Sequence, residues 1–561
     1  MTDAAGYGEL LRQLREDIAY RRLDSGMRCL ESHRSLLESL DATQKDAGVL
    51  LGYLAQWVDI GFAGPQLVED LLARFPKDTR ASLPLRDYLH VRMAEGLLAM
   101  AHEEFDQAIR HFTFVESVEE EVRDREMLAV SNFWIARCLR SQGRYDDAIS
   151  YTERARGLAQ DLGYRQMAAV MQVLESWLAF QKAKLPEAAR ILLEAEAALV
   201  HTDDYVNRGN IQSAYGRIAR RESRYQRALE YFEKAMEEYA RRNPRHPNMA
   251  RSLVNMASAE RLMCLQLRRT MDASTASRKA VTARDQAAAA PMADARTRFA
   301  QLRGRALERL RAAQQIYESQ DNHRGMGAVH VLRGFLCLDS GELDKAGSEA
   351  ALAFRLGESK TDYILMARAR ILECIVENAK FDEQIDEDSG PHRHAQLAHD
   401  YARESVDFAK HTQNRRLLAR AYVWQGMTLA NDFFDNLEAA RQCCDAAAAL
   451  LKPQGPDYIW DDLQDLKARI LRRGPIETVL REWSQGLIGD KTFQQITEDF
   501  AHIIIPKVWE REDRKVSRVA ARLSISPKKV RRVLRAAGLL GAAVPEKKRN
   551  PTNLTGASSP Q

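Results

Sequence analysis

The sequence lacks the motifs that mark the common enzyme classes. It contains no GxxxxGK[ST] phosphate-binding loop and no GxGxxG after a strand, so neither of the usual nucleotide-binding arrangements is indicated. It also contains no HExxH zinc motif and no GxSxG nucleophile motif. We therefore expect no catalytic residues and no cofactor, and we predict that the protein is not an enzyme.

Cysteine is scarce, and long apolar runs are missing. The seven cysteines form no CxxC pair, which favours reduced, packed thiols. His392, His394 and His399 could hold a metal, but no cysteine accompanies them, so we expect no metal site. No apolar stretch is long enough to span a bilayer, and the N-terminal segment has no apolar signal core. These absences predict a cytoplasmic protein that does not bind a membrane.

The chain does have length and an uneven distribution of charge. Its 561 residues exceed what one hydrophobic core can hold, so several domains or an elongated array are expected. The formal net charge is +4, but fourteen lysines and arginines face only four acidic residues between Ile505 and Asn550. The remainder of the chain is therefore net negative. A cationic end of this kind is typical of a protein that meets a polyanion.

The middle of the chain carries a repeat with a period near forty residues. An alanine recurs at this spacing, as Ala108, Ala148, Ala188 and Ala228, then Ala306 and Ala346, and more loosely Ala398 and Ala439. In four units a small residue stands twelve positions earlier, namely Gly96, Ala136, Gly216 and Gly334. Two antiparallel helices need small residues where their backbones approach. The pattern thus predicts helix pairs in which the small residue of the first helix faces the alanine of the second.

These residues resemble the tetratricopeptide repeat over roughly residues 90–450. The period is longer than that family's usual thirty-four residues, so HEAT-like pairs remain an alternative for the weaker units. The 78 residues between Ala228 and Ala306 predict one degenerate unit over Met249–Val281. The resemblance implies an all-α superhelical array whose groove binds a peptide or protein partner.

A different pattern occupies Val516 to Leu539. It indicates two short helices around the turn Ser524–Ser526, with Ser526 as the cap of the second helix and Pro527 at its first position. Apolar residues of both helices would face a small core. The candidate DNA-contacting residues on the second helix are Ser526, Lys528, Lys529, Arg531, Arg532 and Arg535.

This segment resembles the Fis-type helix-turn-helix of bacterial enhancer-binding activators, although their ATPase motif is missing here. Two positions depart from the family pattern: Ser524 replaces a glycine in the turn, and Lys529 replaces a threonine after the cap. The resemblance implies binding in the major groove of double-stranded DNA. It also implies a homodimer formed through the preceding helix, Thr492–Trp509.

The sequence thus divides into four parts. We expect an N-terminal helical or capping region (1–90), a repeat array (91–471), a helix-turn-helix domain (475–543) and a disordered basic, polar tail (544–561). The leading interpretation is a DNA-binding transcriptional regulator whose array binds a partner. The alternative is a non-catalytic scaffold or adaptor whose terminal helix pair serves dimerisation or anchoring.

Overall fold

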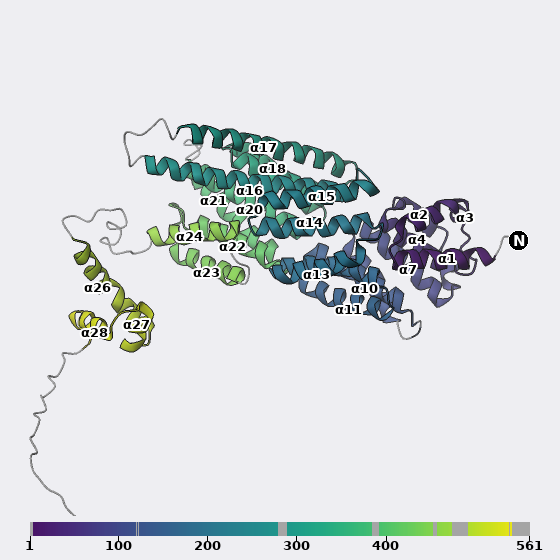
Figure 1. Cartoon of the computed structure of the whole chain (residues 1–561), viewed down its shortest axis with the longest axis horizontal. Coiled ribbons are helices and arrows are strands. Elements are labelled where there is room, and N and C mark those ends of the chain that lie inside the picture. The colour runs from purple at the N-terminus through teal and green to yellow at the C-terminus, as the bar shows by residue number, and fades with distance from the viewer. Residues whose placement is uncertain are drawn as a thin grey trace, which may run out of the picture. The chain divides into compact units, whose positions relative to one another are not determined.

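The computed structural model describes residues 4–118, 121, 123–278, 289–383, 392–452, 457–473, 492–537 and 539–540. Within these ranges the chain forms helices and no strands, which confirms the all-α prediction (Figure 1). The chain divides into two compact units, residues 1–470 and 471–561. The segment 475–491 and the tail 544–561 lie outside the described residues.

Six helices precede the repeats and share a core with them. They are α1 (Ala4–Ala19), α2 (Leu23–Ser32), α3 (Arg34–Glu38), α4 (Ala47–Ile60), α5 (Gln66–Leu72) and α6 (Lys77–Ala81). The side chain of Trp57 on α4 is fully buried in the same hydrophobic cluster as Phe112 of the first repeat. Arg21, at the α1–α2 connection, forms a buried 2.6 Å ion pair with Asp204. The N-terminal helices are therefore packed into the first unit.

The repeats form antiparallel helix pairs, and in the first four pairs a short described turn joins the two helices. In chain order the described pairs are α7 (Leu85–Ala101) with α8 (Phe105–Ser117), α10 (Arg125–Gln142) with α11 (Tyr145–Asp161), α12 (Arg165–Gln181) with α13 (Leu185–Leu199), α14 (Tyr205–Arg221) with α15 (Tyr225–Arg242), α16 (Pro247–Arg278) with α17 (Ala289–Glu318), α18 (His323–Leu338) with α19 (Leu343–Ser359), α20 (Tyr363–Asp382) with α21 (His392–Lys410), and α22 (Arg415–Leu429) with α23 (Leu437–Leu451). A further helix, α24 (Tyr458–Arg473), follows the last pair.

The periodic alanines lie on the second helix of each pair, as predicted. Ala108, Ala148, Ala188, Ala228, Ala306, Ala346 and Ala398 are all fully buried. In the last pair the fully buried residue is Ala440, and Ala439 is only half-buried, so that prediction was wrong by one position.

The small residues of the first helices do not all face the alanine. A Cβ added to Gly96 would lie 2.5 Å from the ring of Phe112, and one added to Gly216 would lie 2.6 Å from the ring of Phe232. Each ring stands one helical turn beyond the alanine on the second helix. The glycine therefore makes room for a phenylalanine, which fills the space between the helices more completely than two small residues would.

The expected degenerate unit over Met249–Val281 does not exist. Helix α16 runs without interruption from Pro247 to Arg278 and packs against α17, another long helix. The 78-residue gap thus reflects one pair of long helices, not two short pairs. The forty-residue spacing could not distinguish one pair of long helices from two pairs of short ones. Lengthening both helices of one pair adds about as many residues as inserting a second pair.

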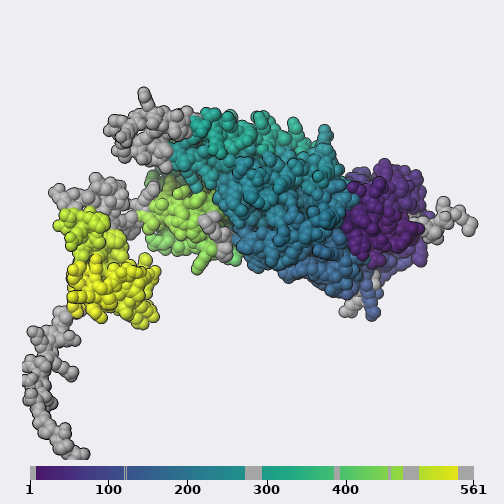
Figure 2. Space-filling model, in the orientation of Figure 1, coloured from purple at the N-terminus to yellow at the C-terminus, as the bar shows by residue number. Residues whose placement is uncertain are grey.

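Successive turns of the superhelix touch one another. The amide of Gln413 donates a 2.9 Å hydrogen bond to the carbonyl oxygen of Gly143, and Asn414 donates one of 3.3 Å to the hydroxyl of Tyr145. Arg269 on α16 pairs with Asp461 on α24 at 2.6 Å. Accordingly, Figure 2 shows the green surface of the last repeats directly against the blue-teal surface of the middle ones. Helices of early and middle repeats are therefore in direct contact with helices of the last ones.

The second unit contains three described helices, α26 (Phe493–Arg511), α27 (Val516–Leu523) and α28 (Pro527–Ala536). Thr492 caps α26 in a capping box with Gln495. Ile505 and Trp509 of α26 pack against Val519 of α27 and Val530 of α28. The two short helices and the helix before them lie where the apolar spacing predicted.

Candidate functional sites

The turn between α27 and α28 has the predicted local structure. Ser526 has an extended backbone, and its hydroxyl oxygen accepts a 3.2 Å hydrogen bond from the amide of Lys529. Pro527 follows at the first helical position, where its missing amide hydrogen costs nothing. Ser524 ends α27 with a φ of 52°, the left-handed region that favours glycine. The departure at Ser524 is therefore a point of backbone strain.

Apolar residues determine which face of α28 points outward. Val530, Val533 and Leu534 are fully buried against α26 and α27. Lys528, Arg531 and Arg535 occupy the opposite side and are exposed. In the described part of the chain none of these three has an ion-pair partner. They present uncompensated positive charge to the solvent.

Two of the predicted contact residues have a different environment. Arg532 forms an ion pair with Glu498 on α26, and the Lys529 ammonium lies 3.8 Å from the same carboxylate. Lys529 is also half-buried rather than exposed, which corrects the sequence interpretation. That interpretation missed Glu498, because only the packing of α26 against α28 brings this carboxylate to the basic helix.

The cations of α27 are paired with acids of the preceding connection. Arg518 contacts Asp513 at 2.6 Å, and Arg522 contacts Glu512. The unpaired positive charge of this helix pair therefore resides on α28, at Lys528, Arg531 and Arg535.

A second basic region lies inside the repeat array. Arginines project from the first helices of several pairs, and some of them have acidic partners: Arg324 pairs with Asp362, and Arg416 with Asp457. Six others form no ion pair with the acidic residues that the structure describes, although Arg420 lies close enough to Asp462 to act on the pKa of that carboxyl. We call them the arginine cluster: Arg140 on α10, Arg217 and Arg220 on α14, Arg251 on α16, Arg368 on α20 and Arg420 on α22.

The members of the arginine cluster affect one another's protonation. Burial, together with Arg251 and other neighbouring arginines, lowers the pKa of Arg140 to about 9. Burial and Arg251 lower the pKa of Arg217 to about 10. These side chains remain protonated at neutral pH, so the folded array holds like charges close together.

The pKa of Tyr458 is also affected by the arginines around it. Burial alone would raise its pKa, but Arg420 and Arg416 lower it to about 7 because they favour the phenolate. The Tyr458 side chain lines a cavity of about 450 Å3 together with Arg221 and Arg269.

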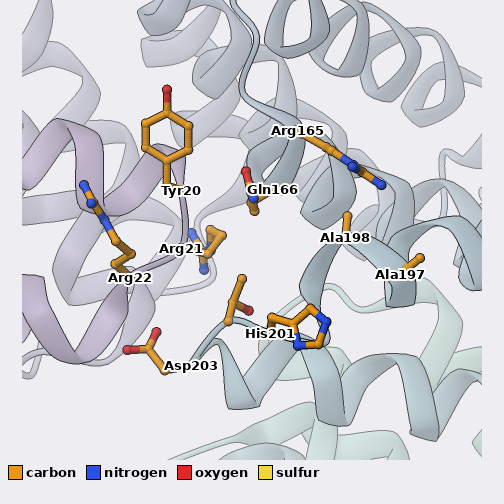
Figure 3. Close-up of a pocket in the computed structure, with 10 residues that line it drawn as sticks. Tyr20, Arg21, Arg22, Arg165, Gln166, Ala197, Ala198, His201 and Asp203 are labelled. Atoms are coloured by element: carbon orange, nitrogen blue, oxygen red, sulfur yellow. The ribbon is translucent and has the colours of Figure 1, made fainter.

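Another pocket lies where the N-terminal helices meet the repeats. It measures about 530 Å3 and is lined by residues of the α1–α2 connection on one side and of α12 and α13 on the other (Figure 3). Its charged groups hold the two parts together. The Asp203 carboxylate accepts hydrogen bonds of 2.6 and 2.8 Å from the first amides of α2, and Arg21 is paired with Asp204. We therefore regard this pocket as part of the internal packing.

The three histidines considered for a metal have separate neighbours. His394 lies 2.6 Å from a carboxylate oxygen of Glu377, whereas the rings of His392 and His399 lie tilted against those of Phe433 and Phe434. In the described ranges no group of three or more potential ligands could hold a metal ion. No described helix is long and apolar enough to cross a membrane.

A tetratricopeptide-repeat family model matches residues 207–265, which include α15 and most of α14. This confirms the repeat resemblance for that part of the chain. No curated protein sequence matches the chain significantly. The Fis-type resemblance stays a prediction.

Several solved structures are similar to this chain over much of its length. Rap protein complexed with Competence and Sporulation Factor is 13% identical, covers 72% of this chain and 97% of its own, and has a TM-score of 0.49. The apo quorum sensor NprR from B. thuringiensis is 13% identical, with coverages of 71% and 98% and a TM-score of 0.48. The human IFIT1 dimer with m7Gppp-AAAA is 12% identical, with coverages of 85% and 96% and a TM-score of 0.43. At these identities and TM-scores, nothing about this chain is argued from them.

Proposed function

We propose that the protein is a DNA-binding transcriptional regulator, with residues 475–543 as its DNA-binding domain and helix α28 as the element that enters the major groove. One observation carries this proposal. Lys528, Arg531 and Arg535 form an exposed, unneutralised row on a helix whose opposite face is buried and whose start is capped. Long cationic side chains in this arrangement reach phosphates and base edges.

Dimerisation through α26 is part of the proposal. Phe493 is 85% exposed and Phe500 is 47% exposed, which is unusual for large apolar side chains on one helix. A twofold contact there would present two copies of α28 to a palindromic site. Exchanging Phe500 for Glu should convert a dimer to a monomer in light scattering. An unchanged mass would show that this face is not the interface.

The repeat array then serves as the partner-binding part of a cytoplasmic, non-catalytic regulator. Its helix pairs form a superhelix whose groove a peptide or protein segment could enter. The second candidate is an adaptor in which the same array assembles partners and the terminal helices only dimerise. The uncompensated charge on α28 favours the first, because a dimerising hairpin gains nothing from unpaired cations.

DNA binding by the full chain decides between the two. Affinity for random duplex DNA should fall steeply with salt, because bound phosphates release counterions. Replacing Arg531 and Arg532 by Ala should abolish this binding. The matched control replaces Arg190 and Arg241, two exposed arginines of the array, and should bind normally. Equal binding by both variants, or the absence of salt-dependent binding, would leave the adaptor as the better account. Selecting bound sequences from random DNA would then define the operator.

A further inference from the structure

The arginine cluster is a concentration of charge that the fold does not neutralise. Other interior arginines have carboxylate partners within the array; Arg261, for example, contacts Asp339 through two nitrogens at 2.6 and 3.0 Å. Arg217 and Arg251 form no ion pair with the acidic residues that the structure describes. Holding like charges together costs stability, so the cluster is a candidate for a role other than folding.

Water reaches this cluster although it lies inside the superhelix. Arg251 and Arg368 are exposed, and Arg140, Arg217, Arg220 and Arg420 are half-buried. At the same time the surrounding protein lowers the pKa of Arg220 to about 10, with Arg416 and Arg368 contributing. The cluster therefore keeps several positive charges in contact with water while the surrounding protein acts on them. An anion that reaches these side chains is attracted by more than one of them.

Three aromatic rings next to the arginine cluster each have a guanidinium group over one face. Arg420 lies 4.7 Å from the ring centre of Phe335 and 5.4 Å from that of Tyr458, and Arg140 lies 5.5 Å from that of Trp177. Single-stranded nucleic acids gain much of their affinity from bases stacked on open aromatic faces. Those faces are occupied here. The interior therefore suits a ligand that offers several anionic groups and no flat rings.

We propose that the arginine cluster binds an acidic peptide segment, a proposal that rests on the partner-binding role proposed above. The aspartate and glutamate carboxylates of the peptide would pair with the arginines that form no ion pair within the array. A guanidinium donates two parallel hydrogen bonds to a carboxylate, which matches this ligand group closely. Arg217 and Arg220 project from α14 within one helical turn of each other. The cluster can therefore engage more than one carboxylate of the same peptide.

The test uses the full chain and a fluorescein-labelled hexaglutamate peptide as the probe, with anisotropy as the readout. Replacing Arg217 and Arg251 by Gln should weaken binding by on the order of tenfold for each arginine. The Arg190→Gln/Arg241→Gln variant carries the same charge change outside the cluster and should bind as wild type. The Arg531→Ala/Arg532→Ala variant should also retain the peptide, which separates the interior from the basic second unit.

Thermal unfolding without peptide provides an independent arm. Because Arg217→Gln/Arg251→Gln removes like charges, its melting temperature should equal or exceed that of wild type while the peptide affinity falls. Should the double variant misfold, Arg368→Gln alone must still weaken the binding of the peptide.

Equal hexaglutamate affinity in all variants would overturn the proposal. A different result would also overturn it: the wild type binds oligothymidylate tightly but does not bind hexaglutamate, and the Arg217→Gln/Arg251→Gln variant binds oligothymidylate weakly. The cluster would then be a site for single-stranded nucleic acid. The affinity of each variant for duplex DNA is measured in the same experiments. Loss of peptide binding with normal DNA binding would contradict only the acidic-peptide proposal, whereas absent DNA binding would contradict the proposed regulator.

Discussion

Glu498 on α26 forms an ion pair with Arg532 on α28, across the interface that holds the basic helix in place. The same carboxylate lies 3.8 Å from the ammonium of Lys529. Two of the five cations on α28 are thus partly neutralised from within the protein. A phosphate that binds either of them must compete with Glu498.

Replacing Glu498 by Gln should strengthen DNA binding. The change frees Arg532 and Lys529 and removes one negative charge from the binding face, so we expect a several-fold higher affinity and a salt dependence steeper by about one to two phosphate contacts. Anisotropy titrations of duplex DNA between low and moderate salt measure both. Glu510→Gln makes the same charge change at an exposed position of α26 and is the control, because Glu510 forms no ion pair with the residues that the structure describes. An equal gain in both variants would mean that net charge alone matters.

Ser524→Gly should stabilise the second unit by about 1 kcal/mol. Ser524 holds a φ of 52°, which costs a residue with a Cβ roughly 1–2 kcal/mol and costs glycine little. Ser517→Gly, inside helix α27, should instead destabilise it by about 0.5–1 kcal/mol, because glycine weakens a helix. Hydrogen exchange of the buried amides of α27 and α28 reads out both changes. A loss of protection in Ser524→Gly would show that Ser524 is not strained.

The features predicted best were those that depend on neighbours in the sequence. The cap at Ser526 and the buried alanines of the repeats were identifiable because helical spacing and capping are local. The pairing of Glu498 with Arg532, thirty-four residues apart, depends on how two helices cross. The arginine cluster was missed for the same reason. Its members look like ordinary surface charges in the sequence, and only the winding of the array brings α10, α14 and α20 around one interior.

Gly216→Ala should destabilise the first unit by about 1–3 kcal/mol. The new methyl group would lie 2.6 Å from the ring of Phe232, which is fully buried and has no room to move. Gly304→Ala, on α17, meets nothing within 4 Å and should instead stabilise the helix by about 0.5–1 kcal/mol. Denaturant unfolding followed by circular dichroism compares the two. Equal effects would show that the α14–α15 contact is looser than the structure indicates.

His323 should make the stability of the array depend on pH. It lies between Glu103, in the α7–α8 turn, and Asp362, in the turn before α20, and so connects successive turns of the superhelix. Burial alone would lower its pKa, but the interactions of its ring nitrogens with these two carboxylates raise the pKa to about 9. The same contacts, with Arg324, hold the pKa of Asp362 well below its usual value.

The raised pKa of His323 determines how pH changes the free energy of unfolding. In the unfolded chain His323 loses its proton near pH 6.5, whereas in the folded chain it keeps the proton to about pH 9. Its stabilising contribution is therefore complete below pH 6.5 and declines as the pH rises to 9. Urea midpoints at pH 6, 7.5 and 9 should fall in the wild type and fall less in His323→Gln. Parallel declines in both proteins would show that the proton on His323 does not hold the turns together.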